Sequence, residues 1–203
     1  MDFLSAIKSI AGEECIFCNE MMSDHTTFKV GGPAKYFVVP YRAEDIKKYI
    51  LAAEEYKIPY YVIGNGSNLL VSDKGYDGMI IMLGRDLGNI TVNGDRITAE
   101  AGTSLARLFN TARRHSLSGL EFAAGIPGTL GGACYMNAGA YGGEMKDVLT
   151  KVITIDRQGN THEYKQGEME LSYRNSIFIR KQEIILSAEM KLCKGDVEKM
   201  THK

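Results

Sequence analysis

The sequence has no long apolar run and no excess of charge of one sign. No stretch reaches the roughly 18 consecutive apolar residues that a membrane-spanning helix requires, so we expect no membrane span. Lysine and arginine together number 24 and aspartate and glutamate 25, which gives a formal net charge of −1. Bulk electrostatic attraction to nucleic acid or to an anionic membrane is therefore excluded.

The first residues, MDFLSAIKSIAGEE, also lack the features of a secretion signal, because they have neither a basic start nor a small-residue cleavage site. The expected compartment is therefore the cytoplasm. The composition is otherwise that of an ordinary soluble globular protein, with 44% hydrophobic and 24% charged residues, and we expect a monomer. A chain of 203 residues can form one large domain or two small ones.

Cysteine is scarce, with four residues in the chain. Cys15 and Cys18 form a C-x-x-C pair, which can be redox-active or half of a zinc site. No second C-x-x-C and no spaced histidine pair supplies the other zinc ligands, so no metal site is expected. A redox pair would open a helix after a strand, whereas this pair lies within or just after a first helix. The favoured interpretation is two unremarkable thiols in a reducing compartment.

The first part of the chain has the pattern of a βαβ unit. Residues 3–10 and 42–58 carry apolar residues at helical spacing, and residues 28–40 are extended with a glycine-proline break. Tyr60–Ile63 reads as a buried strand, and 79–83 as another. A strand, a helix and a strand in this order predict parallel pairing.

The second part has the pattern of an antiparallel sheet with a helix. Two alternating runs flank Asn93-Gly94 and predict a hairpin in which both turn residues have positive φ. Residues 104–115 predict a helix, and 148–155, 160–165 and 183–192 predict strands. The helix is expected to bury Leu105, Leu108, Phe109 and Ala112. The expected boundary between the two parts lies near Gly84.

Two segments are unusually rich in glycine. Gly64–Asn68 interrupts the apolar runs of YVIGNGSNLLVSD directly after a predicted strand, at the edge where open α/β sheets bind ligands. The second segment begins at Gly119, and its Leu, Phe, Ile, Tyr and Met residues are not typical of a low-complexity linker. Neither segment has the third glycine of G-x-G-x-x-G or a G-K-[ST] motif. We expect residues 64–68 and 125–132 to face one cleft and to present main-chain amides to a phosphate, although 64–68 alone could be a plain turn.

Three motifs together resemble the UDP-N-acetylenolpyruvoylglucosamine reductase family, flavoenzymes that make UDP-N-acetylmuramic acid for peptidoglycan. They are GNGSNLLVSDKGYDG, GLEFAAGIPGTLGGACYMNAGAYGGE and LSYRNSIF. The resemblance runs from about Asp24 to Leu192. It implies an α+β, two-subdomain FAD-binding fold of the vanillyl-alcohol-oxidase type. Residues 1–83 would form a βαβ lobe, and 84–203 a second lobe with a mostly antiparallel sheet and helices.

The resemblance also implies the cofactors and the substrate. FAD would lie non-covalently between the two subdomains with its pyrophosphate on the first glycine loop, and NADPH would be the electron donor. The substrate would be UDP-N-acetylglucosamine enolpyruvate. Asn137 and the residues after it either line the flavin or support the loop. The implied FAD-binding residues are Gly64, Asn65, Gly66, Ser67, Asn68, Leu69, Gly125, Ile126, Pro127, Gly128, Gly131, Gly132, Asn137, Ala138 and Gly139.

Arg174 is the one candidate catalytic residue. The family has an arginine in a Y-R-x-S motif, which falls on Arg174 here, and Tyr173 and Arg174 would bind substrate. Reduction of an enolpyruvyl group builds negative charge next to a carboxylate. A guanidinium can bind both carboxylate oxygens and stabilise that charge. Outside this motif, a single arginine would be read as a surface residue.

The resemblance ends before the part of the family that supplies a serine proton donor and a glutamate. The last residues, DVEKMTHK, predict the beginning of a helix, so we expect a truncated chain in which the C-terminal substrate domain is absent. Two alternatives stay open. The chain could be another FAD oxidoreductase of the same fold, or a flavin-binding fragment without turnover.

Overall fold

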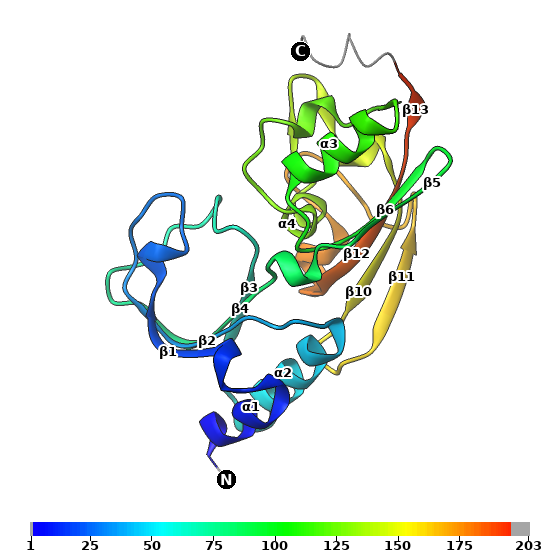
Figure 1. Ribbon diagram of the computed structural model, residues 1–203. Helices are drawn as coiled ribbons and strands as arrows, with labels where there is room; N and C mark the ends of the chain where they lie inside the picture. Colours follow the sequence, from blue (N-terminus) through cyan, green and yellow to red (C-terminus); the bar gives the residue numbers. More distant parts are fainter. Residues whose placement is uncertain (1, 196–203) are drawn as a thin grey trace. The chain divides into compact units, whose positions relative to one another are not determined.

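The computed structural model describes residues 2–195. Within them the chain forms two compact units. Unit 1 contains the residues up to Leu87 together with Arg157–Asn160, and unit 2 contains Gly88–Asp156 and the residues from Thr161 on. Each unit is built around its own sheet, of four strands in unit 1 and of five strands in unit 2 (Figure 1).

Unit 1 has a mixed sheet in the order β1-β2-β4-β3. Its strands are β1 (Ile16–Met21), β2 (Pro33–Val38), β3 (Tyr60–Ile63) and β4 (Tyr76–Met82). Strands β2 and β3 lie on either side of β4 and run parallel to it, whereas β1 is antiparallel to β2. The predicted βαβ unit and its parallel pairing are therefore confirmed, with β4 beginning three residues earlier than predicted.

Two helices of unit 1 pack against each other (Figure 1). They are α1 (Phe3–Ala11) and α2 (Ala43–Tyr56), and both were predicted. The Asp2 side chain caps α1 by accepting a 2.8 Å hydrogen bond from the Ser5 amide. The apolar side of α2 buries Ile46, Ile50 and Ala53.

Strand β1 was not predicted, because it is an edge strand whose residues are mostly exposed and show little apolar alternation. Its position splits the C-x-x-C pair between two environments. Cys15 is buried and its Sγ donates to the Ala11 carbonyl oxygen over 3.2 Å, whereas Cys18 is exposed on β1. Both thiols are free.

Unit 2 has an antiparallel sheet in the order β11-β10-β12-β6-β5, as predicted. Its strands are β5 (Ile90–Asn93), β6 (Arg96–Glu100), β10 (Leu149–Ile155), β11 (Thr161–Lys165) and β12 (Ile184–Lys191). Two short ribbons accompany this sheet. They are formed by β7 (Leu117–Ser118) with β13 (Cys193–Lys194), and by β8 (Gly139–Ala140) with β9 (Gly143–Glu144).

The turn of the β5–β6 hairpin lies one residue later than predicted. Asn93 pairs with Arg96, so the two turn residues are Gly94 and Asp95, and the positive φ of 61° falls on Gly94. The prediction of a positive φ at Asn93 was therefore wrong. The register places Ile97 and its same-face neighbour in the core, and this burial decides where the turn begins.

Unit 2 has three α-helices within the described range: α3 (Leu105–Arg114), α4 (Leu130–Tyr135) and α5 (Ile177–Lys181). Helix α3 was predicted, and Ser104 caps it by accepting from the Arg107 amide over 3.3 Å. Phe109 was predicted to be buried but is half-buried, and Thr111 is buried in its place. Helices α4 and α5 were not predicted, because five- and six-residue segments carry almost no helical periodicity.

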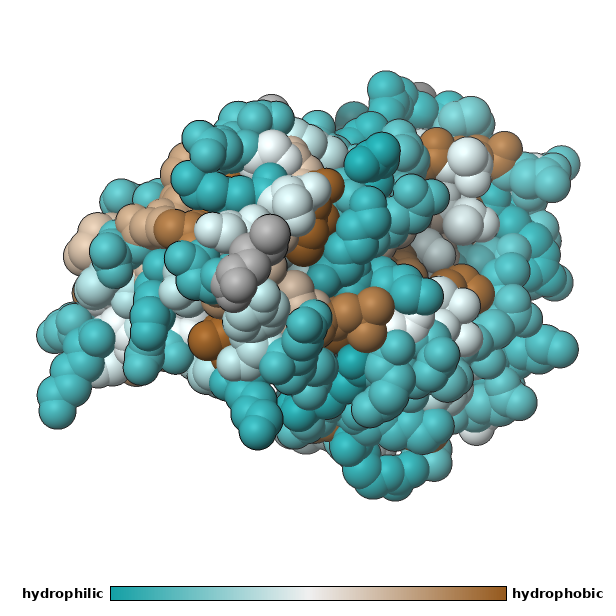
Figure 2. All heavy atoms as spheres, turned by 90° about the horizontal axis from the view of Figure 1, so that it is seen from below, coloured by the Kyte–Doolittle hydropathy of each residue, from teal (hydrophilic) through white to brown (hydrophobic). Residues whose placement is uncertain are grey.

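No helix within residues 2–195 has the length and apolar character needed to cross a membrane. Hydrophilic residues cover most of the face shown in Figure 2, and hydrophobic residues appear there in small separate groups. The helix that was predicted at 196–203 lies outside the described residues.

Candidate functional site

The first glycine segment forms a loop in unit 1 directly after β3. The main-chain amides of Asn65, Gly66 and Ser67 have no hydrogen-bond acceptor in the part of the chain that the structure describes. Gly66 is itself buried. Buried amides are almost always paired, so the unpaired amide of Gly66, with those of Asn65 and Ser67 beside it, favours an anion as the missing acceptor.

Gly66 also has a reason to be glycine that involves no ligand. Its φ is 60°, and a Cβ placed on it would lie 2.0 Å from the carbonyl oxygen of His25. The Thr27 amide donates to the Gly66 carbonyl oxygen over 3.2 Å. The loop is therefore packed backbone to backbone against His25–Thr27. This packing is a second reason for the glycine, beside the approach of a ligand.

The end of the first loop is anchored by an apolar side chain. Leu69 packs against the core cluster of Met22, Ala34, Phe37, Ile63 and Ile80. Its side chain therefore holds the loop to the core of unit 1. If Leu69 contacts FAD, it does so through its main chain. Asn65 and Asn68 are exposed, and Ser67 is half-buried.

The second glycine segment lies in unit 2 and is a loop only as far as Thr129. The prediction of a loop through residue 132 was wrong, because α4 begins at Leu130 and includes Gly131 and Gly132. The start of this helix is fastened to Thr103 and Ala101. The Leu130 amide donates to the Thr103 carbonyl oxygen over 2.8 Å and the Gly131 amide to that of Ala101 over 2.9 Å.

The glycines of this segment divide into two kinds. A Cβ on Gly131 would lie 2.9 Å from the Ala101 Cβ, so this glycine permits the helix to pack on its neighbour. A Cβ on Gly125 would meet no atom within 4 Å, and one on Gly132 would meet the Thr129 hydroxyl oxygen at 3.7 Å. Packing therefore does not explain why Gly125 and Gly132 are glycine.

Unpaired polar groups accompany these open glycines. Within the described ranges, the amides of Gly125, Gly128 and Gly132 have no acceptor, and the buried Thr103 hydroxyl has no partner. Unpaired donors beside glycines with no side chain in front of them can receive a phosphate or a flat ring system. Both segments therefore fit FAD, whose pyrophosphate requires donors.

Asn137 supports the chain and has no spare hydrogen-bonding group on its side chain for a flavin. It is 2% exposed. Its Nδ2 donates to Glu144 Oε2 over 2.7 Å and to the Ser172 carbonyl oxygen over 2.9 Å, and its Oδ1 accepts from the Lys146 amide over 2.9 Å. Of the two interpretations left open by the sequence, these bonds favour support of the loop.

The two residues after Asn137 are also held within unit 2. Ala138 is buried, and its amide donates to the Ala133 carbonyl oxygen over 2.8 Å. Gly139 pairs with Glu144, and a Cβ on it would lie 2.8 Å from the Glu144 Cβ. Close packing of the β8–β9 ribbon therefore explains this glycine.

Tyr173 and Arg174 form the tip of a tight turn in unit 2. The amides of Ser172 and Asn175 each donate to the other residue's carbonyl oxygen over 3.1 Å. Arg174 has a φ of 51° and is exposed, and its Cζ lies 5.9 Å from the centre of the Tyr173 ring. Among the residues described, no carboxylate pairs with this guanidinium. The charge is therefore available to an anion.

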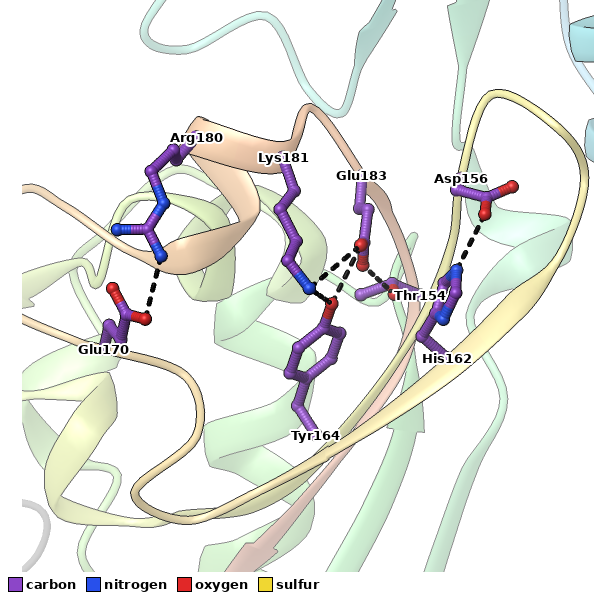
Figure 3. Close-up of polar contacts among 8 residues, drawn as sticks. All are labelled: Thr154, Asp156, His162, Tyr164, Glu170, Arg180, Lys181 and Glu183. Carbon is purple, nitrogen blue, oxygen red and sulfur yellow. Dashed lines mark hydrogen bonds and ion pairs between the residues drawn. The ribbon is translucent and has the colours of Figure 1, made fainter.

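A buried carboxylate that sequence reasoning missed lies between β10, β11 and α5 (Figure 3). Glu183 is 5% exposed and accepts from the Thr154 hydroxyl over 2.5 Å and from the Tyr164 hydroxyl over 2.8 Å. Lys181 Nζ donates to the Tyr164 hydroxyl oxygen over 2.8 Å. Burial raises the pKa of Tyr164. The groups satisfy one another, so the cluster is structural, and no spacing in the sequence indicates it.

The candidates fall into two sets. Gly64–Leu69 belongs to unit 1, and every other candidate belongs to unit 2. Within unit 2 the structure joins Asn137 to the Tyr173–Arg174 turn through a direct hydrogen bond to Ser172. In α4, burial raises the pKa of the Cys134 thiol, which disfavours the reactive thiolate form.

Comparison with known proteins identifies the family of the chain. Residues 34–165 match the family model of the FAD binding domain. The chain is 46% identical over 197 residues to UDP-N-acetylenolpyruvoylglucosamine reductase of Caldanaerobacter subterraneus subsp. tengcongensis, which covers 97% of this chain and 65% of that relative. It is 41% identical over 203 residues to the reductase of Alkaliphilus oremlandii, at 98% and 67% coverage.

A solved structure confirms the predicted fold class. The crystal structure of UDP-N-acetylenolpyruvylglucosamine reductase from Thermus caldophilus superposes with a TM-score of 0.77 at 36% identity, covering 90% of this chain and 64% of that one. The chain thus spans about two thirds of the length of the relatives it matches. It belongs to the UDP-N-acetylenolpyruvoylglucosamine reductase family and carries the FAD binding domain of that family.

Proposed function

We propose that this chain binds FAD non-covalently and supplies the flavin site of an NADPH-dependent reductase. The reaction would convert UDP-N-acetylglucosamine enolpyruvate to UDP-N-acetylmuramate in the synthesis of peptidoglycan precursors. The observation that carries the proposal is the row of unpaired amides at Asn65, Gly66 and Ser67. A pyrophosphate can accept from such a row without a lysine.

The second segment would contribute in a different way. Gly125 and Gly132 present backbone with no side chain in front of it, so a flat group can approach to contact distance. The amides of these residues and of Gly128 add donors at the same place. Ile126 and Pro127, which connect Gly125 to Gly128, are half-buried and exposed respectively, and both are open to a ligand.

Arg174 would bind the carboxylate of the enolpyruvyl group, with Tyr173 beside it. When bound, FAD would carry hydride from NADPH to the substrate. A guanidinium keeps its charge at any physiological pH and presents parallel donors to both carboxylate oxygens. It therefore stabilises the negative charge that builds up next to the carboxylate during reduction. The left-handed backbone of Arg174 supports this role, since strained residues cluster at functional sites.

The cofactor is tested by titrating the flavin-free chain with FAD and with FMN and following the quenching of flavin fluorescence. FAD is expected to bind in preference to FMN, because only FAD has the pyrophosphate. Equal affinity for the two flavins would contradict the proposal that the 65–67 amides bind the pyrophosphate. A folded chain that takes up neither flavin would overturn the proposal.

The reaction is tested by adding substrates to the FAD-loaded protein in a joined form, fused to the part of a family relative that this chain does not span, because the resemblance places the proton donor in that part. Oxidation of NADPH that depends on the enolpyruvyl sugar nucleotide is expected. Another FAD oxidoreductase of this fold would instead consume oxygen and release hydrogen peroxide with a different donor. Release of peroxide without reduction of the enolpyruvyl sugar nucleotide would replace the proposed reaction by that alternative.

A further inference from the structure

The turn that carries Arg174 is tied at both ends to the C-terminal end of α4, at its last residue Tyr135 and at Asn137 just beyond it. On one side, Asn137 Nδ2 donates to the Ser172 carbonyl oxygen over 2.9 Å. On the other side, the Ser176 hydroxyl donates to the Tyr135 carbonyl oxygen over 2.5 Å. Asn137 and Ser176 are both 2% exposed, so water does not compete for these two bonds.

Asn137 has the features of a brace between three segments. Besides Ser172, it contacts Glu144 on β9 and the Lys146 amide. Its own φ of 47° lies in the left-handed region, which asparagine tolerates better than most residues. A side chain that uses both donors and its acceptor within the protein fixes the distance between the segments it joins.

The guanidinium of Arg174 has no such fixed partner. Its contact is the 5.9 Å approach to the Tyr173 ring, and Arg174 forms no ion pair with a residue in the described range. Its φ of 51° costs on the order of 1 kcal/mol or more for a residue with a Cβ. The turn must therefore be held by other contacts, and the Asn137 and Ser176 bonds lie at its two ends.

We propose that Asn137 and Ser176 are positioning residues that hold the Arg174 turn in register with α4. The glycine-rich start of α4 is the part of unit 2 assigned to the flavin, and Arg174 is assigned to the substrate carboxylate, so the inference rests on the proposed function. The two hydrogen bonds would set the distance between the start of α4 and the Arg174 guanidinium. Neither residue touches substrate or flavin in this scheme.

The bonds are tested first without any ligand, by hydrogen exchange of the peptide that contains Ser172 and Asn175. Asn137→Gly removes the side chain and keeps the left-handed backbone free of strain. Exchange in this peptide is expected to become about tenfold faster, as for the loss of one buried hydrogen bond. Ser176→Ala is expected to have a similar effect on the same peptide.

A matched double variant separates the brace on the turn from support of β8 and β9. In Asn137→Asp with Glu144→Gln, the amide of the new glutamine can donate to the new carboxylate, and the Lys146 amide keeps its acceptor. The bond to Ser172 is lost. Exchange of the Ser172 peptide should stay fast while residues 138–146 stay protected. Protection of both peptides would overturn the assignment of Asn137 as the anchor of the turn.

The role in substrate binding is tested by a double-mutant cycle with Arg174→Ala. The affinity of the FAD-loaded protein, in the joined form that includes the part of a relative this chain does not span, is measured for the enolpyruvyl sugar nucleotide by the flavin absorption change. It should fall about tenfold in Asn137→Gly. In the Arg174→Ala background Asn137→Gly should have no further effect, because Asn137 acts through Arg174. Additive losses would show that Asn137 does not act through Arg174 and would overturn the inference.

The two parts of the test also separate this inference from the proposed function. Failure of the wild-type protein to bind FAD, or of its joined form to bind the sugar nucleotide, would overturn the proposed function. The exchange experiment would still show whether Asn137 and Ser176 hold the turn. Binding of both ligands with unchanged exchange of the Ser172 peptide would keep the proposed function and overturn the inference.

Discussion

Gly66 and His25 lie backbone against backbone, so that a Cβ on Gly66 would be 2.0 Å from the His25 carbonyl oxygen. The loop with the unpaired amides is therefore shaped by contacts inside unit 1 before any ligand binds. A loop that is already shaped loses less entropy on binding than one that must order around its ligand. The contact with His25 therefore gives Gly66 a structural role that does not depend on ligand binding, and the two roles can be tested separately.

Gly66→Ala is expected to destabilise the flavin-free protein. The positive φ and the clash with His25 together should lower the free energy of unfolding by about 2 to 5 kcal/mol. Urea unfolding followed by circular dichroism measures this change. Gly94→Ala is the matched control, because Gly94 has a φ of 61° and no atom within 4 Å. Equal losses in the two variants would mean that the loop relieves the clash.

Gly125→Val is expected to weaken FAD binding while it leaves the stability of the flavin-free protein nearly unchanged. No atom lies within 4 Å of the position of its Cβ, and its φ is not positive, so the stability of the flavin-free protein should change by less than about 0.5 kcal/mol. FAD affinity should fall about tenfold or more, because the side chain occupies the space left for the ligand. Unchanged FAD affinity in a fluorescence titration would remove Gly125 from the cofactor site.

The βαβ part of the fold could be predicted because its signals are local. The helical spacing of apolar residues in α2 and the short run of apolar and aromatic residues in β3 each predict one element. Their order along the chain predicts the parallel pairing. Strand β1 and helix α4 could not be predicted in this way. The start of α4 is held by bonds to residues about thirty positions earlier, such as the Gly131 amide to the Ala101 carbonyl oxygen.

The candidate site also has a part that could be predicted from the sequence and a part that could not. The glycine-rich segments and Arg174 stand out in the sequence through composition and motif. The reason for each glycine does not, because it depends on which backbone lies opposite, as His25 lies opposite Gly66. The brace from Asn137 to Ser172 spans 35 positions and has no spacing rule of its own.

Glu183→Ala is expected to be strongly destabilising although Glu183 lies outside the candidate site. The change leaves the buried Thr154 and Tyr164 hydroxyls without their acceptor, which should cost about 2 to 4 kcal/mol. Thermal and urea unfolding measure the change. Glu163→Ala is the control, because Glu163 is half exposed and lies 3.8 Å from Lys151, so its loss should cost less than about 1 kcal/mol. Similar losses would contradict the buried role of Glu183.

Stability is expected to fall in acid through Glu189. Hydrogen bonds from Thr150 and then Arg96 hold the pKa of Glu189 below its usual range. A lowered pKa in the folded state gives stability that is present above the unfolded pKa of about 4.3 and is lost as the pH falls through the folded value. Glu189→Gln should therefore be less stable than the wild type by about 1 kcal/mol at pH 7. The difference should begin to shrink as the pH falls below about 4.3 and should vanish once the pH is below the folded-state pKa. A constant difference across this range would contradict the assignment.

Arg174→Lys tests whether the planar fork of the guanidinium matters. Lysine keeps the charge but binds a carboxylate as a point donor. In the joined form, which includes the part of a relative that this chain does not span, reduction of the enolpyruvyl group by the reduced flavin-loaded protein should therefore slow. Arg174→Ala should slow it further, by about 10²- to 10³-fold. Reduction of the flavin by NADPH involves no such carboxylate and should stay nearly constant. Stopped-flow absorbance at the flavin band measures the two half-reactions separately.

The control for this experiment is Arg180→Lys. Arg180 is an exposed arginine of the same unit, and its Nη2 lies 2.8 Å from a carboxylate oxygen of Glu170 (Figure 3). Because its charge is already paired at the surface, neither half-reaction should change. Slowing of both half-reactions by Arg174→Lys would point to a disturbed flavin site, and slowing of neither would leave Arg174 as a surface residue at the tip of a turn. Only selective slowing of substrate reduction agrees with a guanidinium that binds the enolpyruvyl carboxylate.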